Sequence, residues 1–418
     1  MKCIRIARRS PRELPKKTMK IQLLSLLFFT LASSGFSQTL YYRDNNGVTA
    51  GFGSLSKDWD ISNTLWTTSS AGDIATTTWV NNVGTPNDAT LDFVGNIVTA
   101  PAIALSADLN LRNLEIKGLN NMTGTTGPTL SSSANRTLTF GTGATVTVED
   151  RSVFTHDFYI RQLTTTAVTS TLNVNSFTKG GAGNMLIAAH STISGANAVV
   201  KVTGVVNVSA GQVSLATFGN AAGTSRLVDV GDATFALGSG TVLNVVNPLS
   251  CTGGQLTSGT AALGFVTGNG TVRGEMAGAA NALTITAKGL TLATVGTVGT
   301  LIIEDSIGIN TTGSPANGTT SFSFANTEVG GLKFDLAANG VNDQITLSQL
   351  TSVDASALSF DRFTFNTLTG FADGNNYTLM SLTGGGSWSG FSTLTGTVGG
   401  LKGTISLSGN NLVLNVGP

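Results

Sequence analysis

The two histidines of this chain are the first residues that could act as a general base. His156 is followed by Asp157 and His190 by Ser191, and a base beside a carboxylate or a hydroxyl is the start of a nucleophilic catalytic set. Neither pair has a third partner nearby, so both histidines are expected to be polar residues at strand rims. A zinc site needs three or four ligands, and two histidines with the distant Cys251 do not supply one.

Three pairs of carboxylates could in principle hydrolyse a glycosidic bond. A glycosidase holds two carboxyl groups about 5 to 10 Å apart in a groove. The candidate pairs are Glu149-Asp150, Asp229/Asp232 and Glu304-Asp305. Each pair lies at the end of an expected strand, where acids usually face solvent, and the pairs are expected several coils apart. No catalytic residue is therefore predicted.

Glycine-rich turns could bind a cation or a phosphate. The run Gly180-Gly181-Ala182-Gly183-Asn184 resembles the first part of a calcium-binding nonapeptide, but Met185 stands where the ligand Asp should be. Residues 44–47 (Asp-Asn-Asn-Gly) and 373–376 (Asp-Gly-Asn-Asn) offer oxygen ligands without a bidentate Glu at the required distance. No glycine-rich run is followed by Lys-Ser/Thr and a helix. We expect turns at these places, and no cofactor or metal site.

A repeating pattern of valines predicts the elements that would position such residues. Between Val199 and Val246, alternating pairs of apolar residues recur at steps of 6, 7, 15, 7 and 8 residues. Short strands at this spacing suit a coil of three strands and three tight corners, about 22 residues long, with the step of 15 skipping one strand over 218–220. The pairs are Val200/Val202, Val206/Val208, Val213/Leu215, Val228/Val230, Phe235/Leu237 and Leu243/Val245. The predicted fold is all-β, a parallel β-helix (β-solenoid).

Composition agrees with this fold. Glycine accounts for 52 of 418 residues and charged residues for only 11%. The mean hydropathy is +0.20, which argues against disorder. Residues 1–20 hold eight bases and one acid, so the rest of this neutral chain carries a net charge of −7. A mildly acidic body with scattered basic residues lacks the basic patch that nucleic-acid binding requires.

The first 37 residues have the pattern of an export signal. A basic stretch precedes the apolar core 21–32, and small residues at Gly35 and Ser37 predict cleavage before Gln38, with Met19 as an alternative start. The apolar core is too short for a membrane anchor, so no transmembrane segment is expected in the mature chain. The protein is expected to be secreted or displayed at the cell surface. Cys251 alone remains after cleavage, so it is expected to be a small buried residue without a disulfide.

The mature chain divides into three predicted regions. Residues 38–100 hold Trp59, Trp66 and Trp79 and are expected to form an N-terminal β cap, because the first coil of a solenoid needs cover. The alternative is that these aromatic rings form a platform for sugars. Residues 101–329 are expected to form the solenoid and 330–418 a C-terminal β module, which ends in a hairpin around Gly409-Asn410-Asn411.

Three segments resemble bacterial autotransporter-associated β-strand repeat proteins. They are the opening 41–47 with its following tryptophans, the Gly-x-Gly-x-Val-x-Gly run 268–274, and the ending from Leu332 to the last hairpin. The resemblance implies a secreted or surface-displayed right-handed β-helix of structural or adhesive type, with no catalytic residues to carry over. The 88 residues after Gly330 are too few for an outer-membrane barrel of about twelve strands, so the likeness is to the passenger part alone.

Together these observations predict a structural or adhesive β-solenoid protein that is not an enzyme. Its expected partners are surface polysaccharide or other cells, and not nucleic acid. Specificity is expected in the aromatic segment before the valine pattern or in the region after Gly330. The alternative is a β-helix protein that binds or cleaves polysaccharide.

Overall fold

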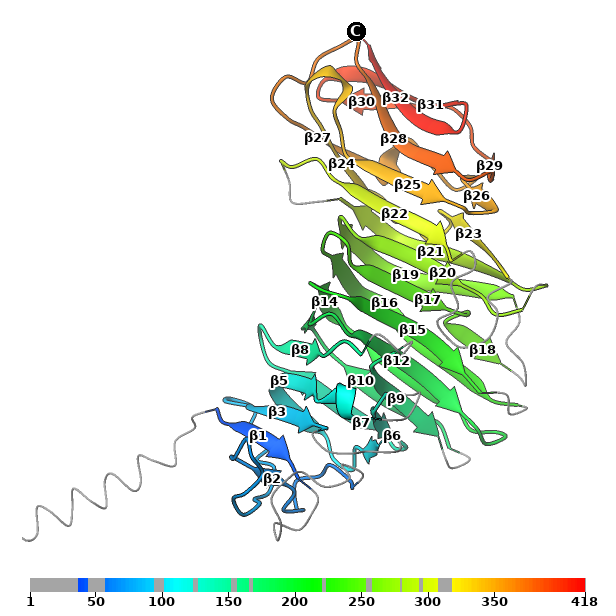
Figure 1. Cartoon of the computed structure of the whole chain (residues 1–418). Helices are drawn as coiled ribbons and strands as arrows, with labels where there is room; N and C mark the ends of the chain where they lie inside the picture. Colours follow the sequence, from blue (N-terminus) through cyan, green and yellow to red (C-terminus); the bar gives the residue numbers. More distant parts are fainter. Residues whose placement is uncertain are drawn as a thin grey trace, which may run out of the picture. The chain divides into compact units, whose positions relative to one another are not determined.

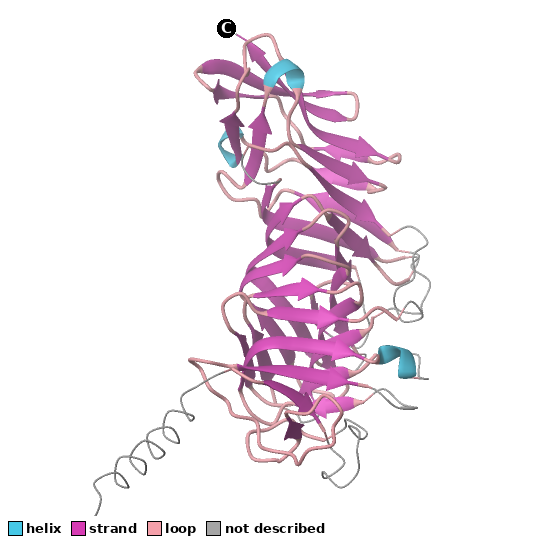
Figure 2. Ribbon diagram, turned by 60° about the vertical axis from the view of Figure 1, so that its left-hand side comes forward, coloured by secondary structure: helices cyan, strands magenta, loops and turns pink. Residues whose placement is uncertain are grey.

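The computed structural model describes residues 37–43, 57–93, 101–122, 127–151, 156–164, 168–219, 223–252, 258–278, 280–292, 296–306 and 318–417. Residues Gln38–Pro418 form one compact unit. The described part of the chain consists of strands, loops and three single-turn 3-10 helices, η1 (Leu119–Asn121), η2 (Ala338–Gly340) and η3 (Phe360–Arg362) (Figure 2). The predicted export signal and the turn at 44–47 lie outside the described residues.

One face of the molecule, which we call wall 3, is a stack of parallel strands. Each strand pairs in parallel register with the next one in the stack (Figure 1). The strands are β4 (Ala102–Ala104), β6 (Thr129–Ser132), β9 (Phe158–Thr164), β12 (Asn184–Ser191), β15 (Gln212–Phe218), β17 (Val242–Val246), β20 (Thr271–Glu275), β22 (Thr300–Asp305), β25 (Gln344–Ser348) and β28 (Asn376–Thr383). The predicted parallel β-helix is therefore present.

Two further faces, walls 1 and 2, belong to one sheet that bends around a corner. Wall 1 contains β7 (Arg136–Phe140), β10 (Ser170–Val174), β13 (Ala198–Val202), β23 (Thr319–Ser323), β26 (Ser352–Asp354) and β29 (Ser387–Ser389). Wall 2 contains β8 (Thr145–Val148), β11 (Phe177–Gly180), β14 (Gly204–Val208), β24 (Leu332–Leu336) and β27 (Phe363–Thr367). Four long strands take part in both walls: β5 (Leu109–Lys117), β16 (Ser225–Leu237), β19 (Gly259–Gly268) and β21 (Ala282–Thr291). A short strand, β18 (Ser250–Thr252), pairs antiparallel with β16.

The coil is longer than the predicted 22 residues. Val200 pairs with Val228, Val206 with Phe235 and Val213 with Leu243, which are separations of 28, 29 and 30 residues. The expected skipped strand over 218–220 is wrong. Instead β15 of wall 3 continues to Phe218, Gly219 has φ of 105°, and the next strand, β16, begins in wall 1 at Ser225.

The predicted inward residues are confirmed. All twelve residues of the six alternating pairs belong to the main hydrophobic core, and none is more than 3% exposed. Burying one such side chain contributes about 1.5–3 kcal/mol relative to leaving it in water. The strand alternation in the sequence therefore reports correctly which residues stabilise the stack.

An aromatic cluster closes the N-terminal end. Strand β1 (Thr39–Tyr42) pairs antiparallel with β2 (Trp66–Thr67) and parallel with β3 (Asn87–Asp92). The rings of Trp59, Trp66 and Trp79 lie with their centroids 4.6–5.2 Å apart, and Tyr42 meets Trp66 edge-on at 5.2 Å. The three tryptophans are 1% exposed or less, so they form the core of a cap and cannot serve as a sugar platform.

The parallel coils continue past Gly330, where a separate β module was expected. Strand β24 pairs in parallel with β21 and β27, and β25 pairs in parallel with β22 and β28. The stack is closed by β30 (Leu394–Val398), β31 (Leu401–Ser408) and β32 (Asn411–Gly417), which pair antiparallel, with β32 on β28. The predicted hairpin is β31–β32, and Gly409 supplies the left-handed turn residue with φ of 59°.

Candidate functional site

The first histidine pair does not form a catalytic set. His156 Nε2 lies 3.0 Å from the Ser214 hydroxyl, which comes from β15, and Gln212 Nε2 donates to the same hydroxyl at 2.7 Å. All three side chains are buried. Burial lowers the pKa of His156 to about 4, so the imidazole is neutral at physiological pH and is out of reach of a substrate. This contact links residues 58 positions apart, which is why local sequence motifs could not reveal it.

The two neighbours of the histidines are also used inside the fold. Asp157 accepts hydrogen bonds from the backbone N–H of Asn184 at 2.7 Å and of Arg151 at 3.2 Å, and burial raises its pKa to about 6. The Ser191 hydroxyl donates to the carbonyl of Ala196 at 3.0 Å. Asp157 therefore links successive coils, whereas Ser191 holds the corner that follows β12.

His190 lies against a cation. Its Nδ1 is 3.4 Å from Arg161 Nη1, and its ring meets Phe218 edge-on. Burial, together with the charges of Arg161 and Arg226, lowers the pKa of His190 to about 4. A neutral imidazole beside a guanidinium is a poor proton acceptor, so this residue is not a general base either.

Two of the carboxylate pairs connect successive coils. Glu149 Oε2 accepts the backbone N–H of Leu119 at 2.8 Å, and Asp305 Oδ2 accepts that of Thr320 at 2.9 Å. Glu304 forms an ion pair with Arg273 of the preceding coil at 2.8 Å. Asn and Asp side chains elsewhere bind the N–H groups that the corners leave out of the ladder, for example Asn175 on Phe140. These acids thus stabilise the coil stack.

The third carboxylate pair lies in a chain of surface charges. Asp229 and Asp232 both approach Lys201 Nζ, at 3.9 and 3.4 Å, and Lys288 Nζ is 3.8 Å from Asp232 and 3.9 Å from Glu328. All of these side chains are more than a third exposed, so each contact is worth little and is screened by salt. The chain balances charge across the outer surface of the sheet that forms walls 1 and 2.

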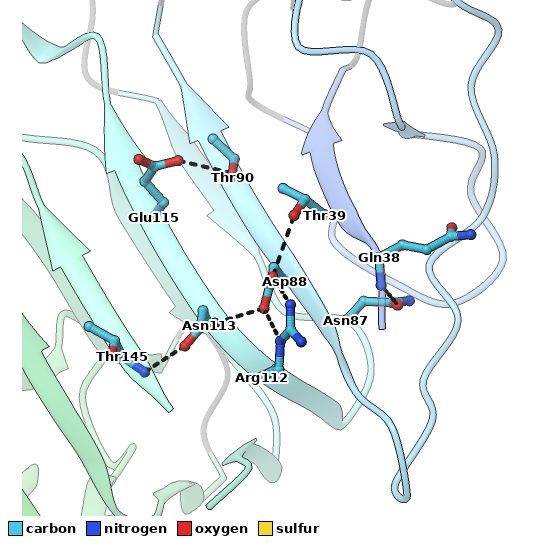
Figure 3. A network of polar contacts seen from close by, with 9 residues as sticks. All are labelled: Gln38, Thr39, Asn87, Asp88, Thr90, Arg112, Asn113, Glu115 and Thr145. Carbon is cyan, nitrogen blue, oxygen red and sulfur yellow. Dashed lines mark hydrogen bonds and ion pairs between the residues drawn. The ribbon is translucent and has the colours of Figure 1, made fainter. Parts of the chain in front are cut away.

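A similar network of polar side chains lies at the N-terminal end (Figure 3). Asp88 of β3 accepts hydrogen bonds from Thr39 of β1 and from Arg112 and Asn113 of β5. Burial opposes ionisation of Asp88, but the hydrogen bonds and charge of Arg112 hold its pKa below the ordinary value. Figure 3 shows the same arrangement continuing to Thr145, whose N–H donates to Asn113. This network ties the cap to the first coils.

A buried lysine lies at the glycine-rich turn. Lys179 occupies an inward position of β11 and is fully buried. Its Nζ donates to the carbonyls of Gly180, Gly181 and Ala210 at 3.0, 2.8 and 3.0 Å. Burial lowers the pKa of Lys179 to about 8. Gly181 has φ of 73°, so the predicted turn is present, and an ammonium group stands among its carbonyls.

The outer face of wall 3 is buried in its middle coils. On β12 the residues Met185, Ile187 and Ala189 belong to the main core, while Leu186 and Ala188 belong to a second cluster with Ala216 and Val246. All four members of this second cluster are 1% exposed or less. In the sequence, the unbroken apolar run 185–189 indicates this burial, because such a run is typical of a strand buried on both sides.

The outer face of wall 2 is open instead and carries two hollows. One, of about 360 Å³, lies over the corners that precede β8, β11 and β14 and includes Thr178 and Val205. The other, of about 480 Å³, lies where β16 and β19 end and includes Thr267, Asn269 and Val298. Asn207 of β14 lines both hollows. Sequence analysis did not find this site, because its residues are ordinary polar partners of inward valines.

Two searches of the described residues and three comparisons complete this picture. Within these residues no three His, Cys, Asp or Glu side chains gather in a way that could hold a metal, and none of the helices is long and apolar enough to cross a membrane. Cys251 is buried as predicted, with its Sγ 3.1 Å from Arg226 Nη2. Comparisons with protein-family models, with curated proteins and with solved structures found no match.

Proposed function

We propose that this chain is a secreted or cell-surface β-solenoid protein with a structural or adhesive role, which works by contact along an outer face. The observation that carries the proposal is the parallel register of wall 3 from β4 to β28, closed at one end by the aromatic cap and at the other by β30–β32. Such a stack holds an extended surface in place with little loss of conformational entropy on binding.

Export is the first part of the proposal that can be tested. Expression of the full chain in a bacterium with an intact secretion system should yield a product whose N-terminus is Gln38, found outside the cytoplasm. Mass spectrometry of the purified product gives the cleavage point. A full-length product that stays in the cytoplasm would contradict the proposal.

Adhesion without catalysis is the second part. Residues 38–418 are attached to a surface, and the retention of polysaccharide-coated beads under flow is measured while the eluate is assayed for reducing or unsaturated sugar ends. We expect retention and no new ends.

Polysaccharide cleavage is the second candidate function, and the observation in its favour is that Asp229 and Asp232 share Lys201 on the surface. If the parent releases new sugar ends and an Asp229→Asn/Asp232→Asn variant does not, polysaccharide cleavage is the function and adhesion is not. Loss of retention in the same variant, with no ends released, would instead place those acids in binding.

A further inference from the structure

The outer face of wall 2 presents a row of uncharged residues in register. Thr145 pairs with Thr178, Thr178 with Asn207, Asn207 with Ala236, and Ala236 with Thr267. Neighbouring strands are about 4.8 Å apart, so the row offers a repeated polar contact along the direction of stacking. The two hollows lie on this face and meet at Asn207, so one extended molecule can touch both.

Among the described residues, no charged side chain lines either hollow. A carboxylated or sulfated chain bound there would lose water without gaining a cationic partner, which is unfavourable. Nucleic acid is disfavoured for the same reason. Other positions of this sheet do carry charges, for example the chain from Lys201 to Glu328, the network around Asp88, and Lys333 of β24. The lining therefore favours an uncharged ligand.

The lining also offers hydrogen bonds that the fold does not use. Within the described residues, the side-chain amides of Asn207 and Asn269 have no hydrogen-bond partner, and both residues are exposed. An amide both donates and accepts, as a sugar hydroxyl does. Val205 and Val298 are 48% and 43% exposed at the same hollows, so each hollow combines polar groups with an apolar surface. Pyranose rings present the same combination of hydroxyls and C–H faces.

An extended peptide is a poorer match for this face. Peptides that bind to sheets usually add a strand at a free edge and pair with its backbone. In wall 2 the backbone groups of β11 and β14 already pair with the coils on both sides. These two strands can therefore offer a ligand their outward side chains but no strand pairing, which suits a glycan chain with many hydroxyls.

We propose that the outer face of wall 2 binds a single chain of an uncharged glycan, which lies across both hollows with Asn207 at its middle. This inference rests on the proposed adhesive function and names the ligand class and the residues for it. The glycan gains no strand pairing with the sheet, so the interaction is weak per sugar and grows with the number of hollows that one chain spans.

Affinity electrophoresis of residues 38–418 tests the inference. The gels contain neutral glycans (glucan, mannan or galactan), acidic glycans (alginate or polygalacturonate) or an uncharged unstructured peptide. We expect one or more of the neutral glycans to retard the protein, and Asn207→Ala and Asn269→Ala each to weaken that binding by about three- to tenfold. Asn410→Ala, in the exposed turn of the β31–β32 hairpin, is the matched control and should bind like the parent. Circular dichroism and thermal melting confirm that each variant is folded.

Several outcomes overturn the inference. In the first, no neutral glycan retards the parent. In the second, acidic glycans or the peptide retard the parent and Asn207→Ala abolishes that retardation. In the third, neutral glycans bind, but Asn207→Ala and Asn269→Ala leave the binding unchanged. If the beads are still retained under flow in these cases, the adhesive function stands and only the site is wrong. If the beads are not retained either, both proposals fail.

Discussion

Walls 2 and 3 are built from the same coils and share one core, yet their outer faces differ. In wall 3 the outward residues Leu186 and Ala188 are buried, and His156 lies nearby with a hydroxyl partner on β15. In wall 2 the outward residues Val205 and Asn207 are exposed and line hollows. Apart from Lys179 on β11, the inward positions named for both walls are apolar, so the difference lies mainly in the alternate positions.

Because of this difference, the outer face of wall 3 contributes to the stability of the fold, whereas the outer face of wall 2 is free to contact a ligand. Outward residues of wall 3 add a second layer of packing, so their replacement should change the free energy of unfolding. Outward residues of wall 2 make few contacts with the rest of the chain, so they can vary with little cost to the fold. The side of the coil that can specify a ligand is the one that packing leaves free.

The largest contrast is expected from one substitution made on both walls. Ala188→Asp places a carboxylate among the buried residues of the second cluster and should destabilise the fold by several kcal/mol, about 3 or more. Ala236→Asp introduces the same group on the half-exposed outer face of wall 2 and should change stability by less than about 1 kcal/mol. Urea unfolding followed by circular dichroism measures both. Equal losses in the two variants would mean that the walls do not differ as described.

A smaller loss is expected at the corner that joins the two walls. Lys179→Met removes the ammonium that three carbonyls share and should destabilise the fold by about 2–4 kcal/mol, because buried acceptors are left unpaired. Lys201→Met removes an exposed lysine with two ion pairs and should cost less than about 1 kcal/mol. The shift in urea midpoint relative to the parent is the measurement. A similar midpoint for the two variants would show that the carbonyls are satisfied in another way.

The smallest effect is a pH dependence confined to wall 3. The unfolded chain protonates His156 near pH 6.5 and the folded chain near 4, so the stability due to this residue falls as the pH drops from 6.5 to 4. Asp157, with its pKa raised to about 6, acts in the opposite sense, because the stability it contributes is lost as the pH rises through 6. In His156→Gln the melting temperature should therefore fall less between pH 6.5 and 4 than in the parent.

His190, beside Arg161 and Arg226, titrates in the parent and in His156→Gln alike, so its effect cancels from the comparison of their melting curves. Asn207→Asp on wall 2 serves as the control and should leave the pH profile near that of the parent. Identical profiles for His156→Gln and the parent would show that this imidazole is not held neutral by burial.

The inward residues could be predicted from the sequence, whereas the coil length could not. Alternation along a strand reports which side faces the core, and every valine chosen on that basis from Val200 to Val245 is buried. Corners have no such period, so the interval between β15, which ends at Phe218, and β16, which begins at Ser225, was mistaken for a missing strand. The merging of walls 1 and 2 through β16 was equally invisible. The buried positions change phase between Val230 and Ala233, and the Gly-Asp pair between them also suits a turn that separates two strands.

The candidate site was harder to predict than the core for a related reason. Asn207 becomes distinctive only when the register places it between Thr178 and Ala236, and register depends on residues 28 to 30 positions apart. The histidines and carboxylates stand out in the sequence because their side chains could do chemistry. In the structure they make contacts within the fold, as His156 does with Ser214. Residue type alone therefore did not single out the outer face of wall 2.

Lys179 has a consequence for the conditions in which this protein can work. Repeat proteins that hold their turns with calcium lose those turns when the ion is removed. Here the positive charge at the turn is joined to the chain by covalent bonds, so neither dilution nor a chelator can take it away. The corner between β11 and β12 should keep its geometry in water that contains no divalent ions, and folding there does not require calcium.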